Sequence, residues 1–379
     1  MVNLSAPGES DPDDATRRWL DQLLSQALQD HASDLHFEPW GSRLRVRRRV
    51  DGLLQEVEVP ARVNPERMVA RLKVLARMDI GERRRPQEGR WGIDWQGERV
   101  YLRVSAMPTV RGEKLVLRVM RLNAPIGSLE GLGYTPHHLQ ALRHALRSPD
   151  GLILFTGPTG AGKSMSLYHC LGEINAPHLN ISTVEDPVEM VMPGVHQISV
   201  HDAIGLDFAS CLRALLRQDP DVLMVGEIRD LATAKVAVQA AQTGHLVLST
   251  LHCNDAAHAL VRLQDLGLTP FHVATCLRLI TAQRLVRRLC PACRTQAAPG
   301  LWQPVGCPQC HRGYKGRVGL FEVLPVSRAL QALVLAQADA LTLSRQARLE
   351  GVGSLRDDGV QKAREGLTTI AEVEAATHD

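Results

Sequence analysis

Apolar residues in the middle of the chain occur as short continuous runs, and helical patterns separate these runs. The runs have the length of strands and lack the polar alternation of a strand with one face in water, so strands buried on both faces are expected. These strands are Leu152–Thr156, Leu179–Val184, Val222–Val225 and Leu246–Thr250. The accompanying helices are Pro136–Arg147, Met165–Ile174, Phe208–Arg217 and Ala232–Gln242. This alternation predicts an α/β fold with a mainly parallel sheet covered on both faces.

The N-terminal part of the chain has a different pattern. Residues Ala15–His31 carry a helical apolar stripe, and residues Arg43–Val50 alternate with period two, with arginines on one face. Arg48 falls on the apolar face, which the pattern does not explain. The other expected elements are strands over Leu53–Val59, Glu98–Ser105 and Lys114–Met120 and a helix over Asn64–Arg77.

These patterns and the chain length predict more than one domain, because 379 residues exceed one ordinary core. Glycines and prolines mark a hinge between the two patterns. The expected divisions are a flexible polar tail (1–14), a small α+β (PAS-like) N-terminal domain (15–122), the hinge (123–133) and a nucleotide-binding domain (134–379).

Composition limits the class of protein. Hydrophobic residues make up 44% of the chain and aromatic residues 4%, which describes a soluble protein with an aliphatic core. The net charge of +3 does not by itself indicate a nucleic-acid or membrane partner. No apolar run approaches the roughly 20 residues of a membrane-spanning helix, and the acidic N-terminus is no signal peptide. Without an export signal, the eight cysteines indicate a reducing, cytosolic setting.

The many arginines of the N-terminal region permit three interpretations. They could bind nucleic-acid phosphates, form a solvated strand face beside acidic neighbours, or serve a nucleotide bound by the second domain. Stacking aromatics are sparse, so nucleic-acid binding is not favoured.

A glycine-rich segment follows the first buried strand. It consists of Gly157, Pro158, Thr159, Gly160, Ala161, Gly162, Lys163 and Ser164, with Met165 next in the helical pattern. The glycines let successive backbone N–H groups point into one concavity, and the helix N-terminus adds partial positive charge. Lys163 would reach the β- and γ-phosphates of ATP, and the Ser164 hydroxyl would ligate Mg²⁺. Strand, loop and helix in this order predict a nucleotide site.

Acidic residues follow two further strands. Glu227 comes just after Val222–Val225, where a P-loop NTPase holds Mg²⁺ or its water shell. Glu185, Asp186 and Glu189 lie at the end of another strand, where a carboxylate can polarise the attacking water. Ordinary turn chemistry at the Asp-Pro step is the open alternative for this second group.

Two histidines, His245 and His252, flank the last of the buried strands. A polar group at a strand end beside the nucleotide could sense the γ-phosphate. A histidine at the end of a strand is more often structural. Two histidines that flank one apolar strand favour a role at the nucleotide only somewhat more than a single one would.

Four cysteines form a C-x2-C-x13-C-x2-C pattern within residues 288–316. They are Cys290, Cys293, Cys307 and Cys310. Two pairs of thiolates give four soft ligands for a tetrahedral structural Zn²⁺ site. Redox chemistry is the alternative, but no βαβ context surrounds the pairs, so zinc is preferred.

The combined motifs resemble the type II secretion/type IV pilus assembly ATPase family (GspE/PilB). The four boxes of that family are matched by Gly157–Ser164, Thr183–Glu189, Val225–Asp230 and Thr243–His252. Residues Ala32–Pro39, Gly313–Val323 and Leu355–Gly359 also match, so the resemblance extends from about residue 32 to the end.

The resemblance implies a RecA-like P-loop NTPase domain in a homo-hexameric motor. Such a motor works on the cytoplasmic face of the inner membrane and couples ATP hydrolysis to assembly of a pilus or pseudopilus through a platform membrane protein. The tetracysteine motif favours an assembly ATPase over a retraction ATPase.

The resemblance also implies roles for individual residues. Lys163 and Ser164 match the Walker A box, Glu227 the Walker B box, and Glu189, beside Glu185 and Asp186, the water-activating position. The remaining matches are the histidine-box residues His245 and His252, the N-terminal-domain arginines Arg103 and Arg118, and the basic residues Arg213 and Arg217 near the nucleotide.

The chain departs from the family pattern in several places. Gln87-Glu88-Gly89 replaces the usual Gln-Asp-Gly, which is a mild change, and Met165-Ser166 replaces the usual threonines, which should not remove catalysis. The matching region begins late, so a short form without the extra N-terminal docking domain is expected. The late start makes a regulatory subunit with little turnover conceivable, although the presence of Glu189 and Glu227 counts against it. A competence or DNA-uptake motor, and a RecA-like nucleic-acid motor that uses the Arg-rich strands, also stay open as alternatives.

Overall fold

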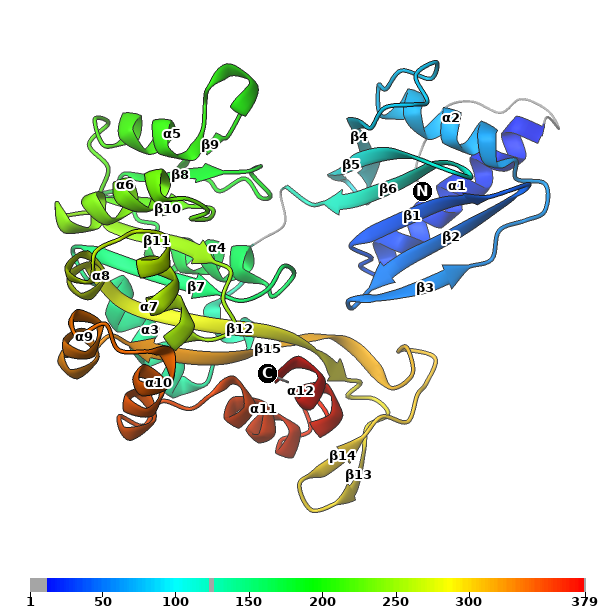
Figure 1. Ribbon diagram of the computed structural model, residues 1–379. Helices are drawn as coiled ribbons and strands as arrows, with labels where there is room; N and C mark the ends of the chain where they lie inside the picture. The colour runs from blue at the N-terminus through cyan, green and yellow to red at the C-terminus, as the bar shows by residue number, and fades with distance from the viewer. Residues whose placement is uncertain (1–11, 123–125, 378–379) are drawn as a thin grey trace. The chain divides into compact units, whose positions relative to one another are not determined.

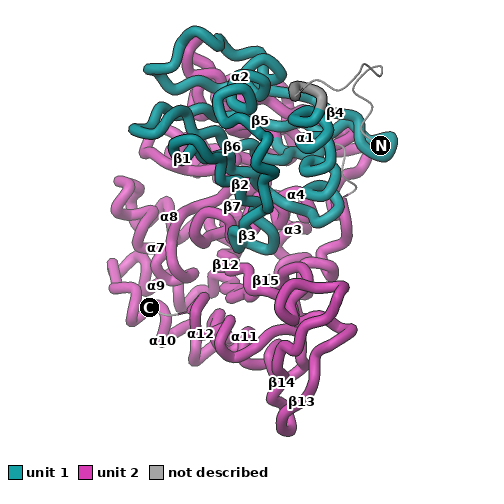
Figure 2. The backbone as a smooth tube through the Cα atoms, turned by 90° about the vertical axis from the view of Figure 1, so that its right-hand side faces the viewer, with its two compact units in different colours: residues 1–124, 189–191 teal, residues 125–188, 192–379 magenta. Residues whose placement is uncertain are grey.

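The computed structural model describes residues 12–122 and 126–377, and the chain divides into two compact units (Figures 1 and 2). Unit 1 comprises residues 1–124 with 189–191, and unit 2 comprises residues 125–188 with 192–379. Residues 1–11 of the predicted tail and 123–125 of the predicted hinge lie outside the described residues. No helix in the described ranges is long and apolar enough to cross a membrane.

Unit 1 is built on a six-stranded antiparallel sheet with the order β3-β2-β1-β6-β5-β4. Its strands are β1 (Asp34–Trp40), β2 (Arg43–Val50), β3 (Leu53–Val57), β4 (Gln87–Trp95), β5 (Glu98–Thr109) and β6 (Gly112–Met120). Helices α1 (Pro12–Gln29) and α2 (Pro65–Leu75) bury their apolar stripes in the core of this unit. Helix α1 begins three residues before the predicted start.

Alternation along the strands separates the core of unit 1 from a polar face. Leu44 and Val46 of β2 are buried, whereas Arg45 and Arg47 of the same strand are ion-paired with Glu38, at 2.9 and 2.8 Å. The structure also explains Arg48, whose guanidinium forms an ion pair with Asp30, just beyond the end of α1. The α+β composition of this unit agrees with the prediction, and its likeness to a PAS domain stays a prediction.

Unit 2 is built on a seven-stranded sheet with the order β15-β12-β7-β11-β10-β8-β9. The strands are β7 (Gly151–Thr156), β8 (Ile181–Glu185), β9 (Val195–Ser199), β10 (Val222–Val225), β11 (Leu246–Leu251), β12 (Leu277–Leu289) and β15 (Tyr314–Pro325). Six of them pair in parallel, and β15 is antiparallel to β12 at one edge. The predicted mainly parallel α/β sheet is therefore confirmed.

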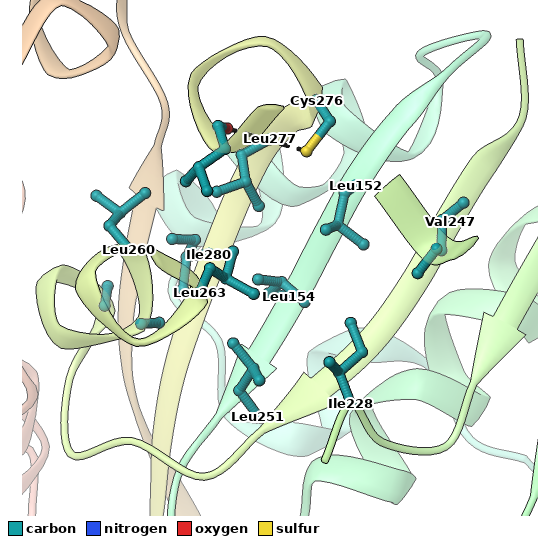
Figure 3. Close-up of a cluster of buried hydrophobic side chains, with 14 of the residues drawn as sticks. Leu152, Leu154, Ile228, Val247, Leu251, Leu260, Leu263, Cys276, Leu277 and Ile280 are labelled. Atoms are coloured by element: carbon teal, nitrogen blue, oxygen red, sulfur yellow. Dashed lines mark hydrogen bonds between the residues drawn. The ribbon is translucent and has the colours of Figure 1, made fainter. Parts of the chain in front are cut away.

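Helices cover both faces of this sheet, and the remaining elements extend the C-terminal part. The elements are η1 (Leu129–Leu132), α3 (Pro136–Leu146), α4 (Lys163–Ile174), η2 (Asp202–Ile204), α5 (Phe208–Leu215), α6 (Leu231–Gln242), α7 (Ala256–Asp265), α8 (Pro270–Cys276), β13 (Thr295–Ala298), β14 (Leu301–Gln303), α9 (Arg328–Leu335), α10 (Ala340–Leu349), α11 (Leu355–Arg364) and α12 (Ile370–Thr377). Aliphatic side chains such as Leu152, Val247 and Ile280 fill the core between sheet and helices (Figure 3).

Candidate nucleotide-binding and catalytic site

The predicted site motifs follow strands that end at one edge of the unit 2 sheet. In the parallel register, Thr156 of β7 pairs with Leu251 of β11, and Val225 of β10 pairs with Val184 of β8. Each motif lies within a few residues of one of these strand ends: the glycine-rich loop after β7, the acidic segment after β8, Glu227 after β10 and His252 after β11. Loops at the carboxyl ends of parallel strands are where open α/β sheets bind their ligands.

At several positions of the glycine-rich loop, the backbone has a positive φ angle that favours glycine. Gly157, Gly160 and Gly162 have φ angles of 149°, 79° and 88°. A Cβ atom on Gly157 would lie 2.4 Å from the carbonyl oxygen of Gln283, so a larger residue does not fit there. Helix α4 starts directly after the loop, at Lys163, and directs its N-terminus toward the loop.

Lys163 is held inside this loop. Its Nζ donates hydrogen bonds to the carbonyl oxygens of Gly157 at 2.7 Å and Pro158 at 3.0 Å. Burial lowers the pKa of Lys163 to about 8, and the charge of Glu227 opposes that shift. The two side chains therefore share one electrostatic environment, as the predicted roles in phosphate and Mg²⁺ binding require.

Glu227 lies between two basic side chains. Arg229 Nη2 approaches Glu227 Oε1 at 2.5 Å, and His252 Nε2 lies 3.4 Å from Glu227 Oε2. Burial alone would raise the pKa of Glu227, but the hydrogen bond and charge of Arg229, together with His252, lower it. Glu227 is thus an anion at neutral pH, suited to hold a divalent cation or its water shell. Arg229 also reaches Asp186 at 3.7 Å.

The acidic segment after β8 separates into residues with different surroundings. Glu185 is 4% exposed, and its carboxylate accepts hydrogen bonds from Tyr168, Thr183 and Gln197. These hydrogen bonds engage both oxygens of the Glu185 carboxylate, and the predicted role of Glu185 at the site stays a prediction. Glu189 belongs with Met190 and Val191 to the three-residue segment grouped with unit 1.

His245 lies at the opposite end of its strand from His252. Leu246, the next residue, pairs with Gly151 at the start of β7, and the six-residue strand spans roughly 20 Å. The Nδ1 atom of His245 lies 3.0 Å from the carbonyl oxygen of Ala240 near the C-terminus of α6. The structure therefore does not bring His245 to the phosphate loop of its own chain, contrary to the expectation.

Arg213 and Arg217 also lie at this amino edge. Arg213 is in the last turn of α5, and Arg217 donates a hydrogen bond to the Arg213 carbonyl oxygen at 2.7 Å. The adjacent Gln218 carbonyl oxygen accepts a hydrogen bond from Asn180, directly before β8, at 2.8 Å. Helices that connect parallel strands run back across the sheet, so the end of α5 is distant from the carboxyl edge. Within one chain, these arginines do not reach the predicted nucleotide.

The N-terminal-domain arginines occupy a row across the polar face of unit 1. Arg90, Arg103 and Arg118 are direct neighbours on β4, β5 and β6. Arg103 is ion-paired with Glu88 at 2.8 Å, and Arg118 with Asp34 at 3.1 Å. Three adjacent guanidinium groups with two carboxylates leave an excess of positive charge on this face.

The four cysteines converge on one point, as predicted. Their sulfur atoms all lie within 4.8 Å of one another, with 3.9 Å between Cys290 and Cys307, 3.6 Å between Cys293 and Cys310, and 3.7 Å between Cys307 and Cys310. Zn–S bonds of about 2.3 Å in a tetrahedron place sulfur atoms about 3.8 Å apart. The cluster therefore fits a structural zinc ion.

Several residues that support the site carry no sequence signal. Gln283 of β12 is 2% exposed, and its amide donates to the carbonyl oxygen of Ala161 in the loop at 2.8 Å while accepting from Ser166 at 2.9 Å. The neighbouring Arg284 donates to the carbonyl oxygen of Asn254 at 2.8 Å. A single glutamine or arginine within a long strand is common, so only the structure identifies these contacts.

Comparison with known proteins agrees with this site. A family model described as "Type II/IV secretion system protein" matches residues 9–375. The Type IV pilus assembly ATPase PilB of Acinetobacter baylyi is 42% identical over 96% of this chain and 66% of its own length. The Type II secretion system ATPase E of Vibrio cholerae is 43% identical over 98% of this chain and 77% of its own length. The chain thus spans about two thirds of the pilus-assembly relative.

Two solved structures share the fold. The Legionella pneumophila ATPase DotB superposes with a TM-score of 0.74 at 20% identity, covering 99% of this chain and 98% of DotB. The pilus retraction motor PilT, solved with bound ADP, superposes with a TM-score of 0.69 at 27% identity, covering 94% of this chain and 96% of PilT. These likenesses confirm the RecA-like ATPase fold.

Proposed function

The chain belongs to the type II/IV secretion system protein family, and on this premise we propose that it binds and hydrolyses Mg²⁺-ATP to power assembly of a secretion pseudopilus or type IV pilus. The observation that carries the proposal is the convergence of Lys163, Glu227 and His252 at the carboxyl edge of one RecA-like sheet. Relatives that match nearly the whole chain are named as ATPases of these two systems.

The loop Gly157–Ser164 with Met165 would cradle the phosphates. Its backbone N–H groups and the N-terminus of α4 favour the negative charge of ATP. Lys163 would exchange its contacts with backbone carbonyls for the β- and γ-phosphates. Ser164, with Glu227 or a water molecule held by it, would bind Mg²⁺, which supplies neutralisation of the phosphate charge.

Glu189 is the group we propose as the base. It would accept a proton from water as the water oxygen bonds to the γ-phosphorus and the bond to the bridging oxygen of ADP breaks. The assignment to Glu189, and not to Glu185, is supported by the burial of Glu185. Asp186 would hold Arg229 beside Glu227.

A hexameric ring is part of the proposal. His245, Arg213 and Arg217 lie at the edge of the sheet away from their own phosphate loop, so they can serve a nucleotide only if it belongs to another copy. Arg103 and Arg118 of unit 1 would neutralise phosphate charge that develops during hydrolysis. Nucleotide-dependent movement of unit 1 in such a ring would yield directed motion.

The remaining parts of the proposal concern zinc and location. The four cysteines would hold a structural Zn²⁺. The protein would work at the cytoplasmic face of the inner membrane, attached through a platform membrane protein, as its membership of a secretion-system family implies.

Phosphate release by the purified full-length chain tests the proposal. Wild type should release phosphate from Mg²⁺-ATP, and Glu227→Gln should lower kcat by about 100-fold. Equal, near-zero rates in both proteins would favour a regulatory subunit with little turnover. Stimulation by DNA with a steep salt dependence would favour a nucleic-acid motor instead.

A further inference from the structure

A single half-buried amide, that of Gln197, contacts both ends of the segment that contains Glu189. Gln197 lies on β9, directly beside Thr183 of β8. Its Nε2 donates to Glu185 Oε1 at 3.0 Å, and its Oε1 accepts from the backbone N–H of Met192 at 2.7 Å. Glu185 and Met192 are the residues that immediately precede and follow the six-residue segment 186–191.

Glu185 connects this amide to the phosphate-loop helix. Its second carboxylate oxygen accepts a hydrogen bond from the hydroxyl of Tyr168, which lies on α4 and is 1% exposed. The first oxygen also accepts from Thr183 at 2.6 Å. A buried carboxylate satisfied in this way is fixed in position, because leaving any of its oxygens without a donor is costly.

The Walker B strand rests against the same carboxylate residue. The backbone N–H of Gly226 donates to the carbonyl oxygen of Val184 at 2.8 Å, and a Cβ atom on Gly226 would lie 3.4 Å from Glu185 Cα. Glu227 is the next residue. Glu185 is therefore the point at which the phosphate-loop helix, the Walker B strand and the Glu189 segment are joined.

We propose that Gln197, through Glu185 and Tyr168, is a positioning residue that sets the path of the segment carrying the catalytic Glu189. This inference rests on the proposed function of Glu189. The contacts of Gln197 itself are with Glu185 and Met192, and neither of these residues belongs to the phosphate loop, so Gln197 acts on where the water-activating carboxylate stands. A displacement of about 1 Å in such a group can lower a rate by about 100-fold.

Gln283 provides a matched comparison, because it is a second glutamine with both ends of its amide engaged. It supports Ala161 of the phosphate loop, whereas Gln197 supports the Glu189 segment. Gln197→Met should lower kcat by about tenfold or more and change the KM for ATP by less than about twofold. Gln283→Met should act mainly on the KM. This split between kcat and KM would not arise if both glutamines served only stability.

A second variant adds a pH readout that does not depend on packing. Gln197→Glu replaces the donor toward Glu185 with a carboxylate, and two neighbouring carboxylates share a proton more readily as the pH falls. The shared proton restores the lost hydrogen bond. The kcat deficit of Gln197→Glu relative to wild type should therefore shrink between pH 8 and pH 6, and this variant also decides the question if Gln197→Met does not fold.

A double-mutant cycle with Glu189→Gln completes the test. If Gln197 acts through Glu189, Gln197→Met should cause little further loss in the Glu189→Gln background. Additive losses, or wild-type kcat in Gln197→Met or in Gln197→Glu at pH 8, would overturn the inference. Failure of the proposed function gives a different result, namely no ATP hydrolysis by wild type or no loss in Glu189→Gln.

Discussion

The two edges of the unit 2 sheet carry similar side chains but use them differently. At the carboxyl edge, Glu227 contacts the guanidinium of Arg229 and the imidazole of His252. At the amino edge, His245 and Arg217 contact backbone carbonyl oxygens near the C-termini of α6 and α5. Within a single chain, basic groups are favourable there because helix C-termini carry partial negative charge. The comparison teaches that, within one chain, a polar residue type serves chemistry or helix termination according to the edge it occupies.

The largest expected effect is on ATP affinity, which should depend on a residue at the carboxyl edge and not on one at the amino edge. Lys163→Met should weaken ATP binding at least about 100-fold, because a charge-assisted phosphate contact of roughly 3 kcal/mol is lost. Arg217→Met should change the affinity by less than about twofold. Calorimetry at dilutions where the chain is monomeric measures both. Comparable losses would show that the amino edge takes part in binding within a single chain.

The second prediction concerns the cysteine cluster, which follows the carboxyl end of β12. Strand β12 continues past its pairing with β7 and ends immediately before Cys290. Because structural zinc contributes folding energy, chelation or Cys290→Ser should lower the Tm by roughly 5 °C or more.

The control for zinc removal is Cys211→Ala, which changes a buried cysteine on α5 outside the cluster. That variant should keep its bound zinc and its response to the chelator, whereas Cys290→Ser should lose both. Absence of zinc from purified wild type by elemental analysis would contradict the assignment.

The two histidines test the comparison within one strand. His252→Ala should lower kcat by about tenfold, since the imidazole that lies 3.4 Å from the Glu227 carboxylate is removed. His245→Ala should lower it by less than about twofold in the monomer. Steady-state phosphate release measures both variants. A larger loss in His245→Ala at dilutions where the chain is monomeric would refute the division of roles between the edges.

The smallest effect concerns pH. Burial lowers the pKa of Lys163 to about 8, and bound phosphates would raise it. Above pH 8, ATP binding must be accompanied by protonation of Lys163, so ATP affinity should fall there by up to about tenfold per pH unit. Below pH 8, Lys163 is already protonated, and its titration should not change the affinity.

Lys163→Arg is the control for the pH effect, because a guanidinium keeps its proton over this range. Its affinity should be flat where that of wild type falls, as measured by calorimetric titration at several pH values. Identical slopes in the two proteins would assign the effect to another group.

Patterns of local chemistry predicted much of the site. The buried run Val222–Val225 has the same bounds in sequence and structure, because its flanks change abruptly in polarity. The phosphate loop and the cysteine cluster were predictable because each function demands particular residues at fixed spacing.

Other parts depend on tertiary contacts that spacing does not encode. Two histidines seven positions apart are close in sequence, yet a whole strand lies between them. Glu185 and Glu189 carry the same functional group, and only packing against Tyr168 separates their surroundings. Strand β12 was not predicted because arginines interrupt its apolar pattern, and these reach partners on other elements, as Arg287 does with Glu372.

Strand β12 also makes two separate motifs mechanically interdependent. Gln283 supports the phosphate loop from this strand, and seven residues later the same strand delivers Cys290 to the metal cluster. Side chains alternate in direction along a strand, so deleting one residue after Gln283 would reverse the side chains that follow, as far as the irregularity between Arg287 and Leu289 in the pairing with β15. The length of β12 from Gln283 to Cys290 therefore links the phosphate loop to the metal cluster.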